Sequence, residues 1–245
     1  MRLGWLLLLP LLAPLGCATG TPAGARASLE YARYHPYAPP SAPRDLPPAP
    51  PHPSLANTLD ALGDRRERIL ETARALVGAR SIALDGRKYR DDCTSLPLAA
   101  YGAAGIDLFS AAERGDNGVT AIYRYAQRQG RIYKGGWPVP GDLVFFRETY
   151  DLNGDGRIND GLTHVGLVDS VGNDATVVII HRVHRGVVRY RMNLNHPDWR
   201  TDPETGEPIN DYLRATGLTA NPLLTGQLFA AYATILDGAQ PVARR

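Results

Sequence analysis

The spacing of hydrophobic residues along this chain changes once, from a helical period to a strand period, and that change limits the fold. Between Asp64 and Gln129 apolar residues recur every three or four positions, as on one face of a helix. Beyond that point, short runs rich in Val, Ile, Phe and Tyr alternate with Gly, Asn and Asp turns. The strands expected from these runs are residues 141–147, 164–171, 175–183 and 186–192. Helices followed by an antiparallel β-meander predict an α+β fold.

Three helices are expected ahead of the strands, over residues 64–77, 92–104 and 119–129, and a glycine follows each of them. A capping box from Asp64 to Glu67 marks the start of the first helix. The second helix should start at Asp92 or Cys93, with Pro97 in or just past its first turn. We therefore expect the helices to pack on one face of the meander.

The N-terminus is predicted to be an export signal. A single Arg precedes an apolar run over residues 3–15, which is shorter than the roughly 20 residues that span a bilayer. The run ends in Gly16-Cys17, which resembles a bacterial lipoprotein cleavage site, so residues 1–17 are interpreted as a signal peptide with Cys17 as the lipidation site. An alanine follows the cysteine, which in a two-membrane bacterium allows anchoring in the outer membrane, facing the periplasm. An ordinary signal cleaved after residues 25–27 remains the alternative.

By its composition, the rest of the chain divides into a linker and a domain. Residues 18–53 are expected to be a Pro-rich linker, since proline at this density favours extended polyproline II. The domain is expected over residues 54–245, with a loop-like stretch at 195–214 and a final packed helix or strand at 223–236. A formal charge of +2 without a clustered basic stripe gives no reason to expect nucleic acid.

Cys93 is the single cysteine of the predicted domain. If Cys17 carries lipid, Cys93 has no disulfide partner, so in an exported protein it is either a buried inert thiol or a thiol kept for its chemistry. Zinc is not expected, because no second Cys and no close His spacing accompany it. At a helix start, free amide N–H groups would lower the thiol pKa and could hold an oxyanion. The position of Cys93 alone does not decide between a buried inert thiol and a nucleophile.

A cysteine nucleophile needs a base, and the base needs an orienting partner. His164 opens a strand, and Gly166 leaves space beside it on the same face. His181 lies near the end of the next strand, so the two imidazoles could be neighbours. His184 should point to the opposite face, and His196 lies in the loop-like tail.

Four stretches in this order, "DDCTSLPLAAYGAAGI", "PVPGDLVFF", "THVGLV" and "IIHR", resemble the NlpC-type cell-wall cysteine peptidases and the related CHAP amidases. The resemblance covers about residues 64–190 and implies a papain-like core. Matched residue by residue, it implies Cys93 as nucleophile, His164 as base and His181 as the orienting third residue. It also implies a structural role for Asp142, at the start of its strand.

The resemblance implies a peptidoglycan hydrolase that cleaves amide bonds of cell-wall stem peptides and requires no cofactor. Upstream of Cys93 the usual Tyr and Gly pair is missing, and Ser95 stands where Gly is common, so the substrate pocket differs from the family pattern. Two alternatives stay open: an acyltransferase on the same core, and a non-catalytic, calcium-stabilised wall-binding lipoprotein. Whether a partner protein activates the enzyme is also open.

The stretch "DLNGDGRINDGLTH" resembles the start of a calcium loop, with oxygen-bearing side chains at alternate positions. The candidate ligands for a structural calcium are Asp151, Asn153, Asp155, Asn159 and Asp160. Leu occupies the position where a bidentate Glu closes a complete loop, which predicts weak binding. A long hairpin tip rich in turn-forming residues is the alternative.

Overall fold

The computed structural model describes residues 55–214 and 223–236. The chain divides into two units between Pro51 and His52, and every described residue belongs to the second unit. The predicted signal peptide, the lipidation site at Cys17 and the Pro-rich linker lie outside the described residues.

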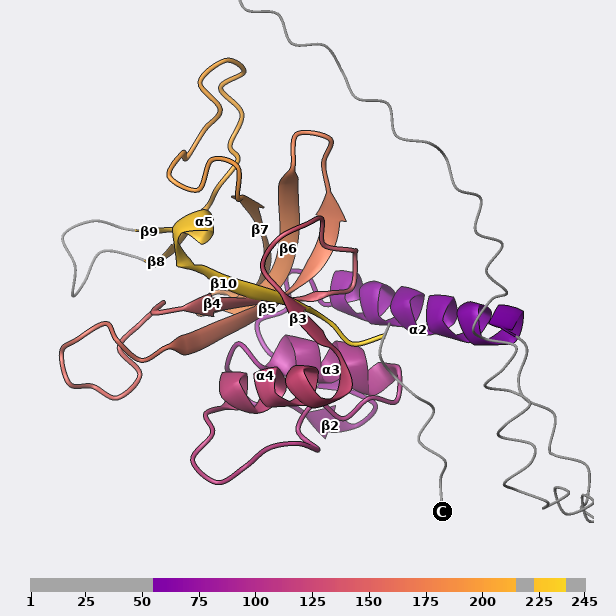
Figure 1. Cartoon of the computed structure of the whole chain (residues 1–245). Coiled ribbons are helices and arrows are strands. Elements are labelled where there is room, and N and C mark those ends of the chain that lie inside the picture. Colours follow the sequence, from indigo (N-terminus) through magenta and orange to yellow (C-terminus); the bar gives the residue numbers. More distant parts are fainter. Residues whose placement is uncertain (1–54, 215–222, 237–245) are drawn as a thin grey trace, which may run out of the picture. The chain divides into compact units, whose positions relative to one another are not determined.

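The fold is α+β, as the sequence predicted, and it is built on one antiparallel sheet of six strands (Figure 1). The strand order is β3-β10-β4-β5-β6-β7. The strands are β3 (Arg131–Tyr133), β4 (Leu143–Arg147), β5 (Leu162–Val171), β6 (Thr176–Val183), β7 (Gly186–Asn193) and β10 (Phe229–Thr234). The predicted meander is therefore confirmed as β4-β5-β6-β7, with each strand antiparallel to the next.

Two short pairs of strands lie outside this sheet. One is β1 (Ala83–Leu84) with β2 (Arg87–Lys88), joined by an Asp-Gly turn. The other is β8 (Tyr212–Arg214) with β9 (Leu223–Leu224). The β8 strand ends a region that the sequence predicted to be loop, so that prediction is wrong for its last residues.

Among the described residues, three helices precede the six-stranded sheet: α2 (Leu55–Ala75), α3 (Ser95–Ala103) and α4 (Gly118–Gln129). The predicted start of the first helix at Asp64 is wrong, because the helix continues nine residues upstream to Leu55. No proline interrupts that stretch, and Leu62 extends the apolar face by packing against the core. The other two helices lie close to their predicted ranges, and Asn117 caps α4 by accepting the N–H of Thr120.

The three helices cover one face of the sheet and form the larger core with it (Figure 1). Ile69 from α2, Leu96 from α3 and Ile122 from α4 are fully buried in this core. They pack with sheet residues such as Leu167 and Ile180. The burial of these apolar side chains is the main stabilising term for a domain with no disulfide among its described residues.

The other face of the sheet carries a second, smaller core, covered by the C-terminal segment. There α5 (Thr225–Leu228) leads directly into β10, which lies between β3 and β4. The final packed segment that the sequence predicted is thus a short helix and an interior strand of the sheet. Among the described residues, no helix has both the length and the apolar character needed to cross a membrane.

Candidate active site

Cys93 lies in the turn directly before α3, and Thr94 is the N-cap residue. The expectation that Asp92 or Cys93 would be the N-cap is therefore wrong by one or two positions. Asp92 still serves the helix start: its Oδ1 accepts the Thr94 N–H at 2.9 Å, and its backbone oxygen accepts the Ser95 N–H at 3.2 Å. These two amides are occupied, so the expectation that they are free for an oxyanion is wrong.

The thiol of Cys93 rests against the backbone of β5 on both sides of His164. Its Sγ donates to the carbonyl oxygen of Thr163 at 3.7 Å. Burial raises the pKa of Cys93 to about 11, although the backbone N–H of Val165 opposes this rise and the charge of Asp92 adds to it. The predicted lowering of this pKa by the helix start is thus wrong. The resting thiol is neutral at pH 7 and needs a base to become a nucleophile.

His164 on β5 and His181 on β6 form a direct pair, as the sequence predicted. The distance between His164 Nε2 and His181 Nδ1 is 2.8 Å, and both side chains are buried. Leu167 pairs with Ile180 in the register of these strands, so the two histidines are diagonal neighbours on one face. Burial lowers the pKa of His164 to about 4 and lowers that of His181 as well. Both imidazoles are therefore neutral at pH 7.

Gly166 permits this close packing of β5 and β6. A Cβ at Gly166 would lie 2.7 Å from Cγ2 of Ile179 and 3.1 Å from Cβ of His181. Side chains do not come this close without displacement. The glycine therefore lets the histidine-bearing strands approach each other.

Gly166→Ala should push His181 away from His164 and lower the kcat of the hydrolysis that the resemblance implies by about tenfold to a hundredfold, because catalytic geometry tolerates little displacement. Overpacking should also lower the free energy of unfolding by about 1–3 kcal/mol. The control is Gly102→Ala in α3, where the new Cβ would lie 3.5 Å from the Tyr89 hydroxyl, an ordinary contact. Steady-state kinetics and urea melts of both variants check this, and equal kinetics in the two would contradict it.

A buried arginine ties the segment before Cys93 to β6. Arg182 donates from Nη1 to the carbonyl oxygen of Asp91 at 3.0 Å and from Nη2 to that of Arg80 at 3.3 Å. Its Nη2 also lies 3.0 Å from Asp91 Oδ1. The sequence pattern did not indicate this contact, although Arg182 directly follows His181. Its positive charge also opposes the rise in the Cys93 pKa.

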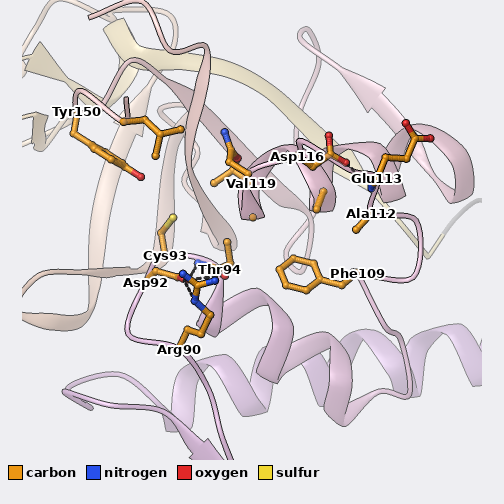
Figure 2. A pocket seen from close by; sticks show the side chains of 14 residues that line it. Arg90, Asp92, Cys93, Thr94, Phe109, Ala112, Glu113, Asp116, Val119 and Tyr150 are labelled. Atoms are coloured by element: carbon orange, nitrogen blue, oxygen red, sulfur yellow. Dashed lines mark hydrogen bonds and ion pairs between the residues drawn. The ribbon is translucent and has the colours of Figure 1, made fainter. Parts of the chain in front are cut away.

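A cavity of about 450 Å³ opens over Cys93 (Figure 2). Figure 2 shows the sulfur pointing into this cavity, which Tyr150 and Val119 also line. Phe109 lines it too, and Leu152 joins Tyr150 from the loop between β4 and β5. Neither histidine of the pair lines the cavity. A substrate in this space would therefore meet the thiol of Cys93 and neither imidazole.

The loop over the cavity is hydrogen-bonded to β5, the strand whose backbone the Cys93 thiol contacts. Thr149 donates its backbone N–H to Thr163 Oγ1 at 2.8 Å, and the two hydroxyl oxygens are 2.9 Å apart. Thr163 is also the residue whose carbonyl accepts the thiol of Cys93. This fixes the position of Tyr150, the next residue, which is half exposed on the cavity wall. The sequence pattern did not indicate these threonines or Tyr150, because their roles depend on which loop folds over which strand.

The remaining predicted residues lie outside this group. His184 is exposed in the two-residue turn between β6 and β7, and the exposed His196 stacks on Trp199. Asp142 is buried and accepts hydrogen bonds from the Tyr133 hydroxyl at 2.5 Å and the Val139 N–H at 3.0 Å. These contacts fit the structural role expected for Asp142.

The predicted calcium ligands lie in the exposed loop between β4 and β5. Asp151 accepts the N–H groups of Gly154 and Gly156, and Asp160 accepts that of Leu152. Within the described residues, no group of three or more His, Cys, Asp or Glu side chains is arranged to hold a metal ion. Calcium binding by this loop stays a prediction.

At 5 mM calcium the melting temperature should rise by about 2–9 °C over that in chelator, since a Kd of about 10⁻⁴–10⁻³ M adds about 1–2 kcal/mol of binding energy. The hydrolysis that the sequence resemblance implies should rise with it, because the loop leads into His164. Asp155→Ala should remove both effects, whereas Asp202→Ala, in a different loop, should keep them. A melting temperature of the wild type that does not respond to millimolar calcium would leave the loop as a hairpin tip.

The candidate site comprises the Cys93 thiol, which contacts the β5 backbone at Thr163, and the histidine pair of β5 and β6. Its parts are a neutral thiol, a neutral imidazole pair and an open cavity, which suit acyl transfer through sulfur. No protein-family model matches this chain, and no curated protein matches it.

Proposed function

We propose that this protein is a cysteine hydrolase with a papain-like core that cleaves amide bonds in the stem peptides of peptidoglycan. The observation that carries the proposal is the contact of the Cys93 thiol with the backbone on either side of His164, together with the bond between His164 Nε2 and His181. A free thiol, an imidazole and a second imidazole behind it supply the nucleophile, base and orienting group of a catalytic triad. The resemblance in the sequence supplies the substrate class.

In the first step the proton of the Cys93 S–H leaves the carbonyl oxygen of Thr163 for His164, which requires the imidazole to move to within reach of the sulfur. The Nε2 atom of His164 is engaged by His181, so Nδ1 is the nitrogen that accepts the proton. The sulfur attacks the amide carbonyl carbon, and the oxygen becomes an oxyanion. The Cys93 N–H remains as a donor close to it, since the next two amides are bonded to Asp92.

In the second step the imidazolium returns its proton to the leaving amine, the C–N bond breaks and a thioester of Cys93 remains. Water then attacks the thioester, giving one proton to His164, and the carboxylic acid product leaves with the thiol restored. His181 stabilises the imidazolium by accepting its Nε2–H. No cofactor enters this balance.

The test incubates the purified protein with isolated stem peptides and measures new amine and carboxyl termini by mass spectrometry. Equal release of both termini supports hydrolysis. A second reaction contains an excess of a primary amine. New amides formed with that amine in place of free acid would show a transferase on the same core, and no cleavage in either reaction would contradict the proposal.

We also propose that the protein is exported and anchored by lipid on Cys17 in the outer membrane, facing the periplasm. The apolar run that ends in Gly16-Cys17 supports this. The linker from 18 to 53 would then hold the domain away from the membrane.

Cys17→Ser should block processing or move the protein from the membrane fraction to the soluble fraction, because the thiol is where the lipid attaches. Cell fractionation and mass spectrometry of the mature N-terminus check this, with Cys93→Ser as the control that keeps its anchor. Unchanged membrane association of Cys17→Ser, or a mature N-terminus downstream of residue 17, would contradict the anchor.

A further inference from the structure

One ring nitrogen of His181 is buried and makes no hydrogen bond within the described residues. The side chain is fully buried, and within residues 55–214 and 223–236 its Nε2 atom has no hydrogen-bond partner. Its other ring nitrogen is bonded to His164. Buried polar atoms are nearly always paired, so an unpaired nitrogen beside the proposed base calls for a physical explanation.

An aromatic ring lies against this histidine. Tyr190 on β7 contacts His181 with ring centroids 4.4 Å apart and planes inclined at 66°. It completes a row of rings across four adjacent strands, in which Phe146 and His164 are 5.9 Å apart and His164 and His181 are 5.0 Å apart. Since β5 and β7 flank β6, His181 meets His164 on one side and Tyr190 on the other.

The chemistry of the proposed base decides where the protons of the pair lie. For His164 to accept the thiol proton on Nδ1, its own proton must be on Nε2 and must be donated to His181 Nδ1. A neutral imidazole carries one N–H, so the proton of His181 is then on Nε2, the atom without a hydrogen-bond partner.

We propose that Tyr190 is a positioning residue whose ring face accepts the Nε2–H of His181 and thereby holds both histidines in the tautomer that leaves His164 Nδ1 free to accept a proton. An inclined contact at 4.4 Å suits an N–H group directed at an aromatic face. This inference deepens the proposed function and rests on His164 acting as the base.

Tyr190 is itself held in place from the surface side. Arg185 donates from Nη2 to its hydroxyl at 3.0 Å, and the Arg185 guanidinium lies 5.6 Å from the ring centroid. The hydroxyl therefore has its own partner, and what Tyr190 offers His181 is the ring. It follows that phenylalanine can replace Tyr190 in this role and that leucine cannot.

The test reads the tautomers directly, in full-length protein labelled with ¹⁵N-histidine, by long-range ¹H–¹⁵N correlation at pH 7. His164→Gln and His181→Gln assign the signals. In wild type and in Tyr190→Phe both histidines should be protonated on Nε2. In Tyr190→Leu the Nδ1–H form of His181 should gain about tenfold relative to the Nε2–H form, because a buried N–H loses its acceptor. The signals of exposed His184 should not change.

The kinetic arm uses the same variants. Tyr190→Phe should hydrolyse stem peptides at close to the wild-type rate, whereas Tyr190→Leu should lose about tenfold in kcat with KM unchanged. Wild-type His181 protonated on Nδ1, or unchanged tautomers in Tyr190→Leu, would overturn the inference, and if that variant does not fold the wild-type spectrum decides. Hydrolysis retained by Cys93→Ala would instead overturn the proposed function and leave the tautomer result standing.

Discussion

Cys93→Ala should lower the rate of stem-peptide hydrolysis by about 10⁴-fold or more, because the variant has no atom that can form the thioester. The free energy of unfolding should change by about 1 kcal/mol or less, since Cys93 lies half-buried in a turn and its thiol makes one long hydrogen bond. Initial rates on isolated stem peptides and urea melts provide the two measurements.

The chain offers a matched control, because it contains one other cysteine. Purified Cys17→Ser should hydrolyse stem peptides in solution at the wild-type rate, since the predicted lipid site takes no part in the chemistry. If Cys93→Ala keeps more than a few per cent of the activity while remaining folded, Cys93 is not the nucleophile. The raised pKa of Cys93 also predicts slow alkylation by iodoacetamide at pH 7 and faster alkylation toward pH 11.

His164→Gln should lower kcat by about 10³-fold, because glutamine fills similar space and can hydrogen bond to His181 but cannot accept the thiol proton. The controls are His184→Gln and His196→Gln, two exposed histidines that contribute nothing to the site. A profile of kcat against pH and a comparison of the three variants check this. Activity lost equally in all three, or kept in His164→Gln, would contradict the role of His164.

His164→Gln should also change how the free energy of unfolding depends on pH. The pKa of His164 is lowered to about 4 in the folded protein from 6.5, so the unfolded chain binds the extra proton. Its contribution to stability is full above pH 6.5 and is lost as the pH falls to about 4, a change of about 3 kcal/mol. His164→Gln should lessen the acid destabilisation by a similar amount. An unchanged pH dependence of unfolding would mean that the imidazole is not buried neutral.

Much of the sheet could be predicted from the sequence, because a strand packed between two cores must show its pattern locally. Phe145, Leu167 and Ile179 are fully buried, and their runs, together with the run over 186–192, gave four strands and their order in the meander. The place of β10 could not be predicted, since an apolar run does not name its partner strands. The start of α2 was missed for a related reason: the capping box at Asp64 is a short pattern that also fits a helix interior.

The pairing of His164 with His181 followed from the strand period and the meander, and the structure confirms it. The electrostatics of Cys93 did not follow. A helix start lowers a thiol pKa when the thiol is exposed to its free amides, but here Asp92 binds the amides and the sulfur is buried against β5. Local sequence shows where a helix begins and does not show what covers the residue before it.

The residues that support the site were missed because each depends on a long-range contact. Arg182 bonds to Asp91 across more than ninety positions of sequence. Tyr190 could have been found, since a two-residue turn after β6 pairs Ile179 with Tyr190 and places its ring diagonal to His181. Aligning the predicted strands through their short turns would have shown that these rings lie in one row.

The central claim is that Cys93 and His164 cleave amide bonds of the cell wall, and digestion of purified sacculi tests it most directly. Wild type and Cys93→Ala are incubated with sacculi, and the soluble fragments are identified by mass spectrometry. We predict that the wild type releases fragments with new amine and carboxyl ends at one amide position, and that Cys93→Ala releases none. Fragments cut at glycosidic bonds, or the same fragments from Cys93→Ala, would contradict the account.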